Sequence, residues 1–109
     1  MENFEKETIA AIATALSDSG IGIVRISGEN AIYIVDSIFR STSGKKILTK
    51  VQSHTIHYGY IVDKDENIID EVMTSVMKAP KSYTMEDTVE INCHGGVLVM
   101  QKVLETVLQ

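Results

Sequence analysis

The order of apolar and polar positions predicts two strands in the first 27 residues. Thr8 to Thr14 (TIAAIAT) is a short apolar run bounded by polar residues, which is typical of a buried strand, although its alanines also allow a helix. Gly22 to Ser27 (GIVRIS) contains three β-branched apolar residues and predicts a second buried strand. Ser17 to Gly20, between them, has the composition of a turn.

A change of period after Gly28 predicts the first helix. Apolar residues recur at i, i+3, i+4 and i+7. These positions are Ala31, Ile34, Val35 and Ile38. The helix should therefore end near Phe39, and Ser27 and Asn30 are its candidate N-caps.

The middle of the chain predicts a connector, a hairpin and a further strand. Ser41 to Gln52 mixes turn formers with three lysines and is interpreted as a solvated connector. Thr55 to Val62 and Ile68 to Met77 flank five polar residues, which favours an antiparallel pair. Pro80 to Met85 is predicted to be a loop, and Thr88 to Asn92 (TVEIN) a strand.

The last predicted element is a helix that follows Gly95 and Gly96 and runs to Gln109. Its wide apolar stripe comprises Val97, Met100, Val103, Leu104, Val107 and Leu108. Such a stripe without a C-terminal stop signal indicates either a surface for a partner or a chain cut from a longer one. Together the elements predict an α+β fold, a mixed β-sheet with two or three helices.

Composition narrows the class of protein. The 109 residues form a single-domain length, and 10 Lys+Arg against 15 Asp+Glu give a net charge of −5. This charge argues against direct binding of nucleic acid by this chain. The single cysteine, Cys93, excludes an intrachain disulfide and a multi-cysteine zinc site. With no membrane-length apolar run and no positive region before Ile9 to Leu16, we expect a cytoplasmic protein that does not contact a membrane.

Two charged residues lie among apolar neighbours in predicted strands, Arg25 in GIVRIS and Glu90 in TVEIN. An ionised group in such a strand is costly unless it is paired. Spacing alone favours a structural interpretation, in which the two residues pair with each other or with backbone groups. The functional alternative is a pocket, in which the carboxylate accepts N–H groups of a heterocycle and the guanidinium holds a carboxylate or a ring carbonyl.

Other candidate residues point less clearly to chemistry. Gly95 to Gly96 fits either an anion site at a helix start or a turn with positive φ. Cys93 and His94 have no acid or second histidine at a productive spacing and are expected to pack or to cap the turn. His54 and His57 should leave opposite faces of a strand, which rejects a shared metal. The glycine-containing stretches lack the remaining residues of nucleotide-binding loops.

Two longer stretches resemble one known family. Ile9 to Gly28 (IAAIATALSDSGIGIVRISG) and Ser82 to Gly96 (SYTMEDTVEINCHGG) are similar to the N-terminal domain of the bacterial tRNA modification GTPases of the MnmE, or TrmE, family. The resemblance covers essentially the whole chain. The two motifs, in this order and at this separation, are a more specific signal than any lone glycine motif.

The resemblance implies one domain over residues 1–109, similar to the tetrahydrofolate-binding domain of aminomethyltransferases. It implies a homodimer that binds 5-formyltetrahydrofolate or another one-carbon tetrahydrofolate. By position it implies Arg25 and Glu90 as the folate-binding residues, with no catalytic and no metal-binding residue in this chain. A third contact of the family, a lysine, falls beyond Gln109. The chain departs from the family at Leu16 to Ser19, where Pro, Gly and Arg are frequent, and at Met85, where glycine is usual.

For the longer parent protein, the resemblance implies a helical domain and a G domain that binds GTP, Mg and K. It also implies tRNA and the FAD-dependent protein MnmG (GidA) as partners in a carboxymethylaminomethyl-type modification of the wobble uridine. This chain alone would then not be an enzyme. Two alternatives stay open: a structural association domain, in which Arg25 and Glu90 pair and the C-terminal helix packs on a second copy, and an independent folate-dependent aminomethyltransferase-like domain.

Overall fold

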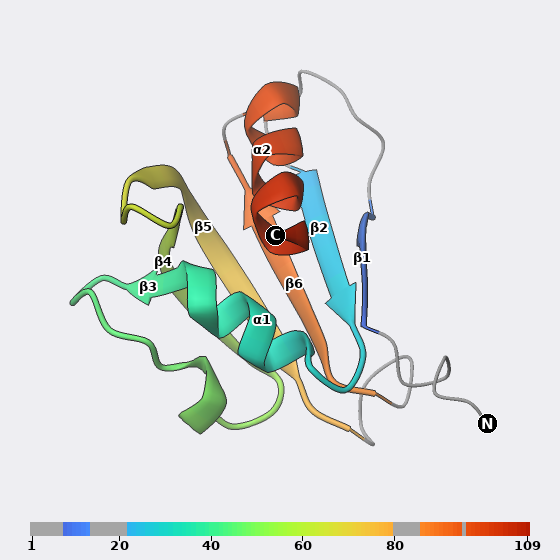
Figure 1. Ribbon diagram of the computed structural model, residues 1–109. Coiled ribbons are helices and arrows are strands. Elements are labelled where there is room, and N and C mark those ends of the chain that lie inside the picture. The colour runs from blue at the N-terminus through green and yellow to red at the C-terminus, as the bar shows by residue number, and fades with distance from the viewer. Residues whose placement is uncertain (1–7, 14–21, 80–85, 95) are drawn as a thin grey trace.

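A six-stranded sheet, with both helices packed against it, forms the framework of the chain (Figure 1). The computed structural model describes residues 8–13, 22–79, 86–94 and 96–109. Its strands are β1 (Ile9–Ile12), β2 (Gly22–Ser27), β3 (Phe39–Ser41), β4 (Thr55–Val62), β5 (Ile68–Met77) and β6 (Thr88–Cys93). They lie in the order β1-β2-β6-β5-β4-β3, and all five pairings are antiparallel. The helices are α1 (Ala31–Ile38) and α2 (Gly96–Leu108), with a short 3-10 helix, η2, at Leu48–Lys50.

The predicted α+β class is confirmed, and β2, β4 and β5 have the predicted bounds. The predicted turn at Ser17 to Gly20 and the predicted loop at Pro80 to Met85 lie outside the described residues. None of the described helices is long and apolar enough to cross a membrane.

One local prediction was wrong, and another was confirmed only in part. The stretch from Ser41 to Gln52 is not merely a solvated connector, because Leu48 within it is fully buried and its N–H donates to Asp36 Oδ1 at 2.9 Å. Asn30 does stand at the N-cap of α1, but its side chain makes no capping hydrogen bond. Its own backbone N–H instead donates to Thr8 Oγ1 at 3.1 Å, which ties the start of the helix to the chain beside β1.

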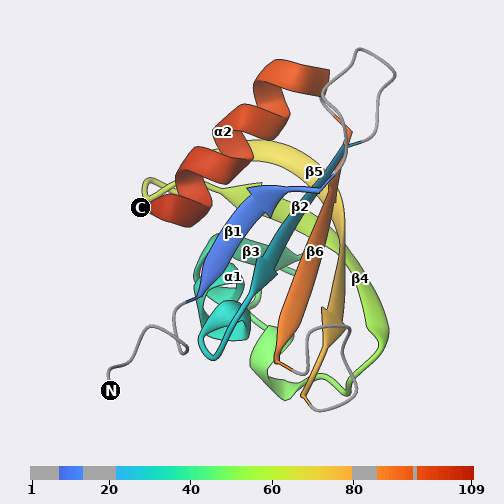
Figure 2. The same cartoon turned by 90° about the vertical axis from the view of Figure 1, so that its right-hand side faces the viewer.

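Both helices pack on one face of the sheet (Figure 2). Alternate residues of each strand point to that face. Its largest fully buried side chains include Phe39, Ile26, Leu48, Ile61 and Ile91. The apolar stripe of α2 contributes Met100, Val103 and Val107 to the same core, so these three residues cover the chain's own sheet and not a partner.

The opposite face, which we call the open face, is covered by neither helix. It presents the other set of alternating strand residues. Four of them are large, apolar and exposed: Ile9, Ile56, Tyr58 and Met73. The open face therefore combines exposed apolar side chains on β1, β5 and β4 with the predicted site residues, which lie on β2 and β6.

Candidate functional site

One row of paired residues crosses the open face and carries both predicted site residues. Arg25 on β2 lies directly opposite Glu90 on β6, and Glu90 in turn lies opposite Ser75 on β5. Arg25 Nε donates to Glu90 Oε2 at 2.7 Å, and Arg25 Nη2 is 2.7 Å from the same oxygen. The interpretation that these two residues pair with each other is confirmed.

Among the described residues, the pair leaves one half of the Glu90 carboxylate without a hydrogen-bond donor. Both guanidinium contacts fall on Oε2, and no described residue donates a hydrogen bond to Oε1. An ionised carboxylate has about four acceptor positions. The Glu90 side chain is only 14% exposed, whereas that of Arg25 is 42% exposed. Glu90 is thus held in place by Arg25 and still has acceptor capacity at a sheltered position.

A hollow of about 240 Å³ lies beside Glu90 on the open face. It is lined by His54, Thr55, Ile56, Ser75, Val76, Met77 and Glu90. Ser75 stands between Ile56 and Glu90 in the strand register, so a small side chain separates two larger ones. The hollow therefore combines apolar surface from Ile56, Val76 and Met77 with polar residues, among them the Glu90 carboxylate.

His54 lies at this hollow in a way that its sequence position did not predict. It precedes β4, in a turn with a φ of 64°, and is not a strand residue. Its backbone N–H donates to Val76 O at 2.6 Å, and its Nδ1 is 2.8 Å from Ser53 Oγ. His57 is in β4, where its Nε2 is 2.8 Å from Thr55 Oγ1. No group of three or more His, Cys, Asp or Glu residues suited to a metal occurs in the described part of the chain.

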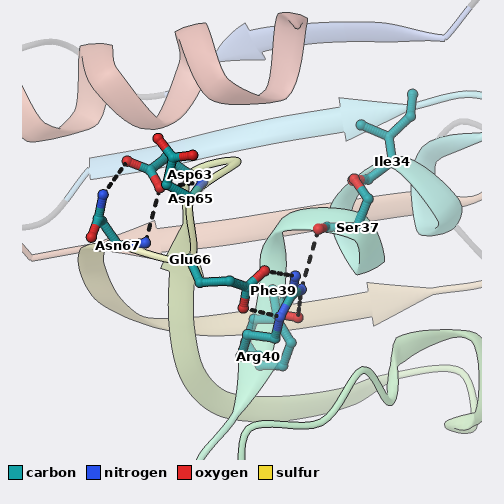
Figure 3. Close-up of polar contacts among 8 residues, drawn as sticks. All are labelled: Ile34, Ser37, Phe39, Arg40, Asp63, Asp65, Glu66 and Asn67. Atoms are coloured by element: carbon teal, nitrogen blue, oxygen red, sulfur yellow. Dashed lines mark hydrogen bonds and ion pairs between the residues drawn. The ribbon is translucent and has the colours of Figure 1, made fainter.

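A larger cavity, of about 580 Å³, lies on the helix side near the ends of α1 and α2. The polar groups at its Arg40 wall bind one another (Figure 3). Arg40 donates from Nε and Nη2 to the two carboxylate oxygens of Glu66, at 3.1 and 2.6 Å, and from Nη1 to two backbone carbonyls. The hydrogen bond from Arg40 is the main cause that lowers the pKa of Glu66.

The turn between β4 and β5 completes this wall. Asp63 Oδ1 accepts the backbone N–H groups of Asp65 and Asn67, both at 2.9 Å, and Oδ2 accepts from Asn67 Nδ2 at 3.3 Å (Figure 3). These bonds, above all that from the Asn67 backbone, lower the pKa of Asp63. Because its anchoring charges are already satisfied by one another, the larger cavity offers fewer groups to a polar ligand than the smaller hollow does.

Cys93 and His94 have structural roles, as predicted. Cys93 is buried, and burial, assisted by the negative charge of Asp70, raises its pKa to about 12, so it is not an activated nucleophile. His94 donates from its backbone N–H to Asp70 Oδ2 at 2.8 Å and from Nδ1 to Glu71 O at 3.0 Å. Gly96 has a φ of 88°, which favours the interpretation of a tight turn, while Gly95 lies outside the described residues.

Residues 8–109 match the family described as GTP-binding protein TrmE N-terminus. The chain belongs to the TrmE N-terminal family. The tRNA modification GTPase MnmE of Lachnoclostridium phytofermentans is 61% identical over 103 residues, which are 94% of this chain and 22% of that protein. The tRNA modification GTPase MnmE of Geobacillus kaustophilus is 55% identical over 105 residues, 95% of this chain and 22% of that protein.

A third relative, the tRNA modification GTPase MnmE of Acholeplasma laidlawii, is 56% identical over 103 residues, 94% of this chain and 22% of that protein. The chain thus spans about a fifth of the length of these curated relatives. The resemblance to the TrmE family is confirmed over nearly the whole chain, and this chain corresponds to the N-terminal domain of MnmE.

Ser75 and His54 line the hollow but were not among the predicted site residues of this TrmE domain. Ser75 reaches the site only through the register of β5 with β6, which no local pattern encodes. The sequence feature that could have indicated Ser75 is a small polar residue within a strand of mostly larger side chains. His54 was assigned to a strand, since the positive φ that ends the preceding turn leaves no mark in the sequence.

Proposed function

We propose that this chain is the folate-binding and homodimerising N-terminal module of a tRNA modification GTPase. The observation that carries the proposal is the Glu90 carboxylate, which Arg25 holds through Oε2, which lines a hollow, and whose Oε1 receives no hydrogen bond from the described residues. The curated relatives are tRNA modification GTPases, which supports the assignment to that process. The module itself binds a cofactor and performs no chemical step.

The hollow suits the ring system of a one-carbon tetrahydrofolate such as 5-formyltetrahydrofolate. A pterin edge carries adjacent N–H donors, and a carboxylate accepts such donors well because the bond is charge-assisted. At about 240 Å³ the hollow is smaller than the range of roughly 300 to 1,000 Å³ for drug-sized ligands. It therefore accommodates the rings, while the remainder of the cofactor extends over the open face.

Dimerisation is proposed to use the open face. Ile9, Ile56, Tyr58 and Met73 expose apolar surface there, and such groups mark association surfaces. The apolar stripe of α2 is less suited to this role because its central residues already pack on the chain's own sheet. The open face would then bring the hollow and the interface between copies close together.

The activity of the longer protein is a proposal of the same kind. We infer that this module serves a cytoplasmic enzyme whose G domain hydrolyses GTP with Mg and K. That enzyme would work with a FAD-dependent partner to modify the wobble uridine of tRNA. The net charge of −5 of this chain indicates that the tRNA contacts lie elsewhere in the enzyme.

Calorimetric titration of 5-formyltetrahydrofolate into the chain tests the folate proposal. Saturable binding that Glu90→Gln weakens more than about tenfold would support it, since the amide keeps the volume but loses an ionised acceptor. Glu105→Gln removes the same charge from an exposed position of α2 and should bind like the parent chain. Absence of binding by the parent chain would overturn the folate proposal and leave association as the role of the module.

Sedimentation tests the dimer. Tyr58→Lys places a charge on the open face, where the parent side chain is 49% exposed, and should shift the chain toward the monomer. Tyr33→Lys is the matched control, because Tyr33 is 70% exposed on α1, an element that covers the other face. Equal association of both variants would place the interface away from the open face.

A further inference from the structure

Three polar atoms of the small hollow lack a hydrogen-bond partner among the described residues. They are Glu90 Oε1, Ser75 Oγ and His54 Nε2, and their residues all line the same space. A carboxylate oxygen accepts, a hydroxyl does either, and an imidazole N–H donates. A small hollow with a hydrogen-bond donor on one residue and an acceptor on another can discriminate between heterocycles. It favours those whose ring edge carries an acceptor and a donor in the matching order.

The hydrogen bonds behind His54 are compatible with a ring that carries its proton on Nε2. The backbone N–H of Lys78 donates to Ser53 Oγ at 2.8 Å, so this oxygen is an acceptor there. The hydroxyl keeps its proton to donate, and His54 Nδ1 lies 2.8 Å away. With Ser53 as the donor to Nδ1, the neutral ring carries its proton on Nε2, which has no partner among the described residues.

The backbone of His54 is also held by a hydrogen bond. Its N–H donates to Val76 O at 2.6 Å, and its φ of 64° lies in the left-handed region. A residue other than glycine seldom adopts that region, and such positions are concentrated at functional sites. The contacts with Ser53 and Val76 therefore hold His54 in place at the edge of the hollow that it lines.

We propose that His54 is a ligand-binding, specificity-determining residue, which donates from Nε2–H to a ring carbonyl oxygen while Glu90 accepts the neighbouring ring N–H groups. This inference rests on the proposed function, because its ligand is the folate ring system. The preferred ligand class is a fused heterocycle with an amide edge, in which a C=O and an N–H are adjacent. A ring with an amino group in place of the carbonyl would present a donor to His54 and bind poorly.

Two variants of His54 separate the donor from the backbone. His54→Asn tolerates a positive φ but carries its amide near the position of Nδ1, so it lacks the donor at Nε2. It should bind 5-formyltetrahydrofolate about fivefold or more weakly than the parent chain, as expected for one lost hydrogen bond. His54→Gln extends an amide N–H toward the position of Nε2 and should restore most of the affinity. Circular dichroism and thermal unfolding verify that both variants are folded.

A matched pair of ligands gives a readout that a purely structural role would not change. We compare 5-formyltetrahydrofolate with its 4-amino-4-deoxy analogue, which differs in the group offered to His54. The parent chain should prefer the 4-oxo compound, and His54→Asn should lose most of that preference.

The possible failures are distinguishable. If the parent chain binds and Glu90→Gln does not, but His54→Asn binds with the parent's affinity and preference, then the role of His54 is overturned and the folate proposal remains. If the parent chain does not bind at all, both are overturned.

Discussion

Arg25 and Glu90 lie opposite each other across β2 and β6, and both guanidinium contacts, from Nε and from Nη2, fall on Glu90 Oε2 at 2.7 Å. A structural ion pair and a ligand site are therefore not exclusive alternatives here. The guanidinium holds one oxygen of the carboxylate, and the other oxygen has no donor in the part of the chain that the structure describes, while Glu90 lines the hollow. The pairing holds Glu90 in position, and it occupies only one of the two carboxylate oxygens.

The Arg25 and Glu90 pair should contribute little to stability. Arg25 is 42% exposed, so solvent screens its charge. Urea unfolding of the parent chain, Arg25→Gln, Glu90→Gln and the double variant should give a coupling free energy of about 0.5 to 1 kcal/mol. A coupling of about 3 kcal/mol or more would instead make the pair mainly a structural element of the sheet.

Much of the fold could be predicted because local patterns agree with tertiary contacts. The alternation in β4 and β5 and the polar residues between them specify a hairpin, and the structure has it with the predicted bounds. The 3.6-residue period of α1 was equally readable, since its apolar stripe is what packs on the sheet. Arg25 and Glu90 stood out because charged residues in apolar strands need partners.

The rest depends on contacts between distant residues. β3 pairs with β4 where Gly59 has no side chain, and a Cβ there would collide with the Phe39 ring and the Arg40 carbonyl. No local period encodes that approach. The hollow likewise requires Ser75 and Glu90 to be in register, although 15 positions separate their numbers, 75 and 90, in the sequence.

Acid should weaken the fold through Glu66 and Asp63. Hydrogen bonds from Arg40 lower the pKa of Glu66, and those from the Asn67 backbone lower the pKa of Asp63. A carboxyl group whose pKa is lowered by folding stabilises the folded state above its unfolded pKa, and this contribution is lost as the pH falls through the folded pKa. The midpoint temperature of thermal unfolding should therefore decline as the pH is lowered below the ordinary pKa values of these groups, 4.5 for Glu and 3.8 for Asp.

Substitutions of the two carboxyl residues test whether they cause this loss of stability in acid. Glu66→Gln and Asp63→Asn should each unfold at a lower temperature at pH 7 and show a flatter decline on acidification, because the titrating group is gone. Glu29→Gln removes a charge from an exposed position beside α1 and should retain the parent's pH profile. A parent profile in both the Glu66 and the Asp63 variants would contradict the assignment.

Thr74→Val should stabilise the chain. Thr74 is fully buried in β5, opposite Ile91, and its Oγ1 has no hydrogen-bond partner among the described residues. Valine keeps the β-branched shape and removes a desolvated hydroxyl. The free energy of unfolding, measured in urea, should therefore rise by about 1 kcal/mol.

Thr106→Val is the matched control for Thr74→Val. Thr106 is also buried, but its Oγ1 donates to Lys102 O at 2.8 Å. The same substitution there removes a satisfied hydroxyl and should lower the free energy of unfolding by about 0.5 to 1 kcal/mol. Destabilisation by Thr74→Val would show that its hydroxyl has a partner in solution, such as a buried water molecule.

Cys93 should be unreactive in the folded chain. Its side chain is buried in β6, and burial and the charge of Asp70 raise its pKa to about 12. At pH 8 only roughly one thiol in ten thousand would then be ionised, and the thiolate is the reactive form. Ellman's reagent should therefore label one thiol per chain in concentrated urea and essentially none in buffer, and the labelling rate across the urea transition should follow the unfolded fraction. Fast labelling in buffer would mean that β6 opens without global unfolding, in which case the position of Glu90 on the same strand would be less rigid than the site requires.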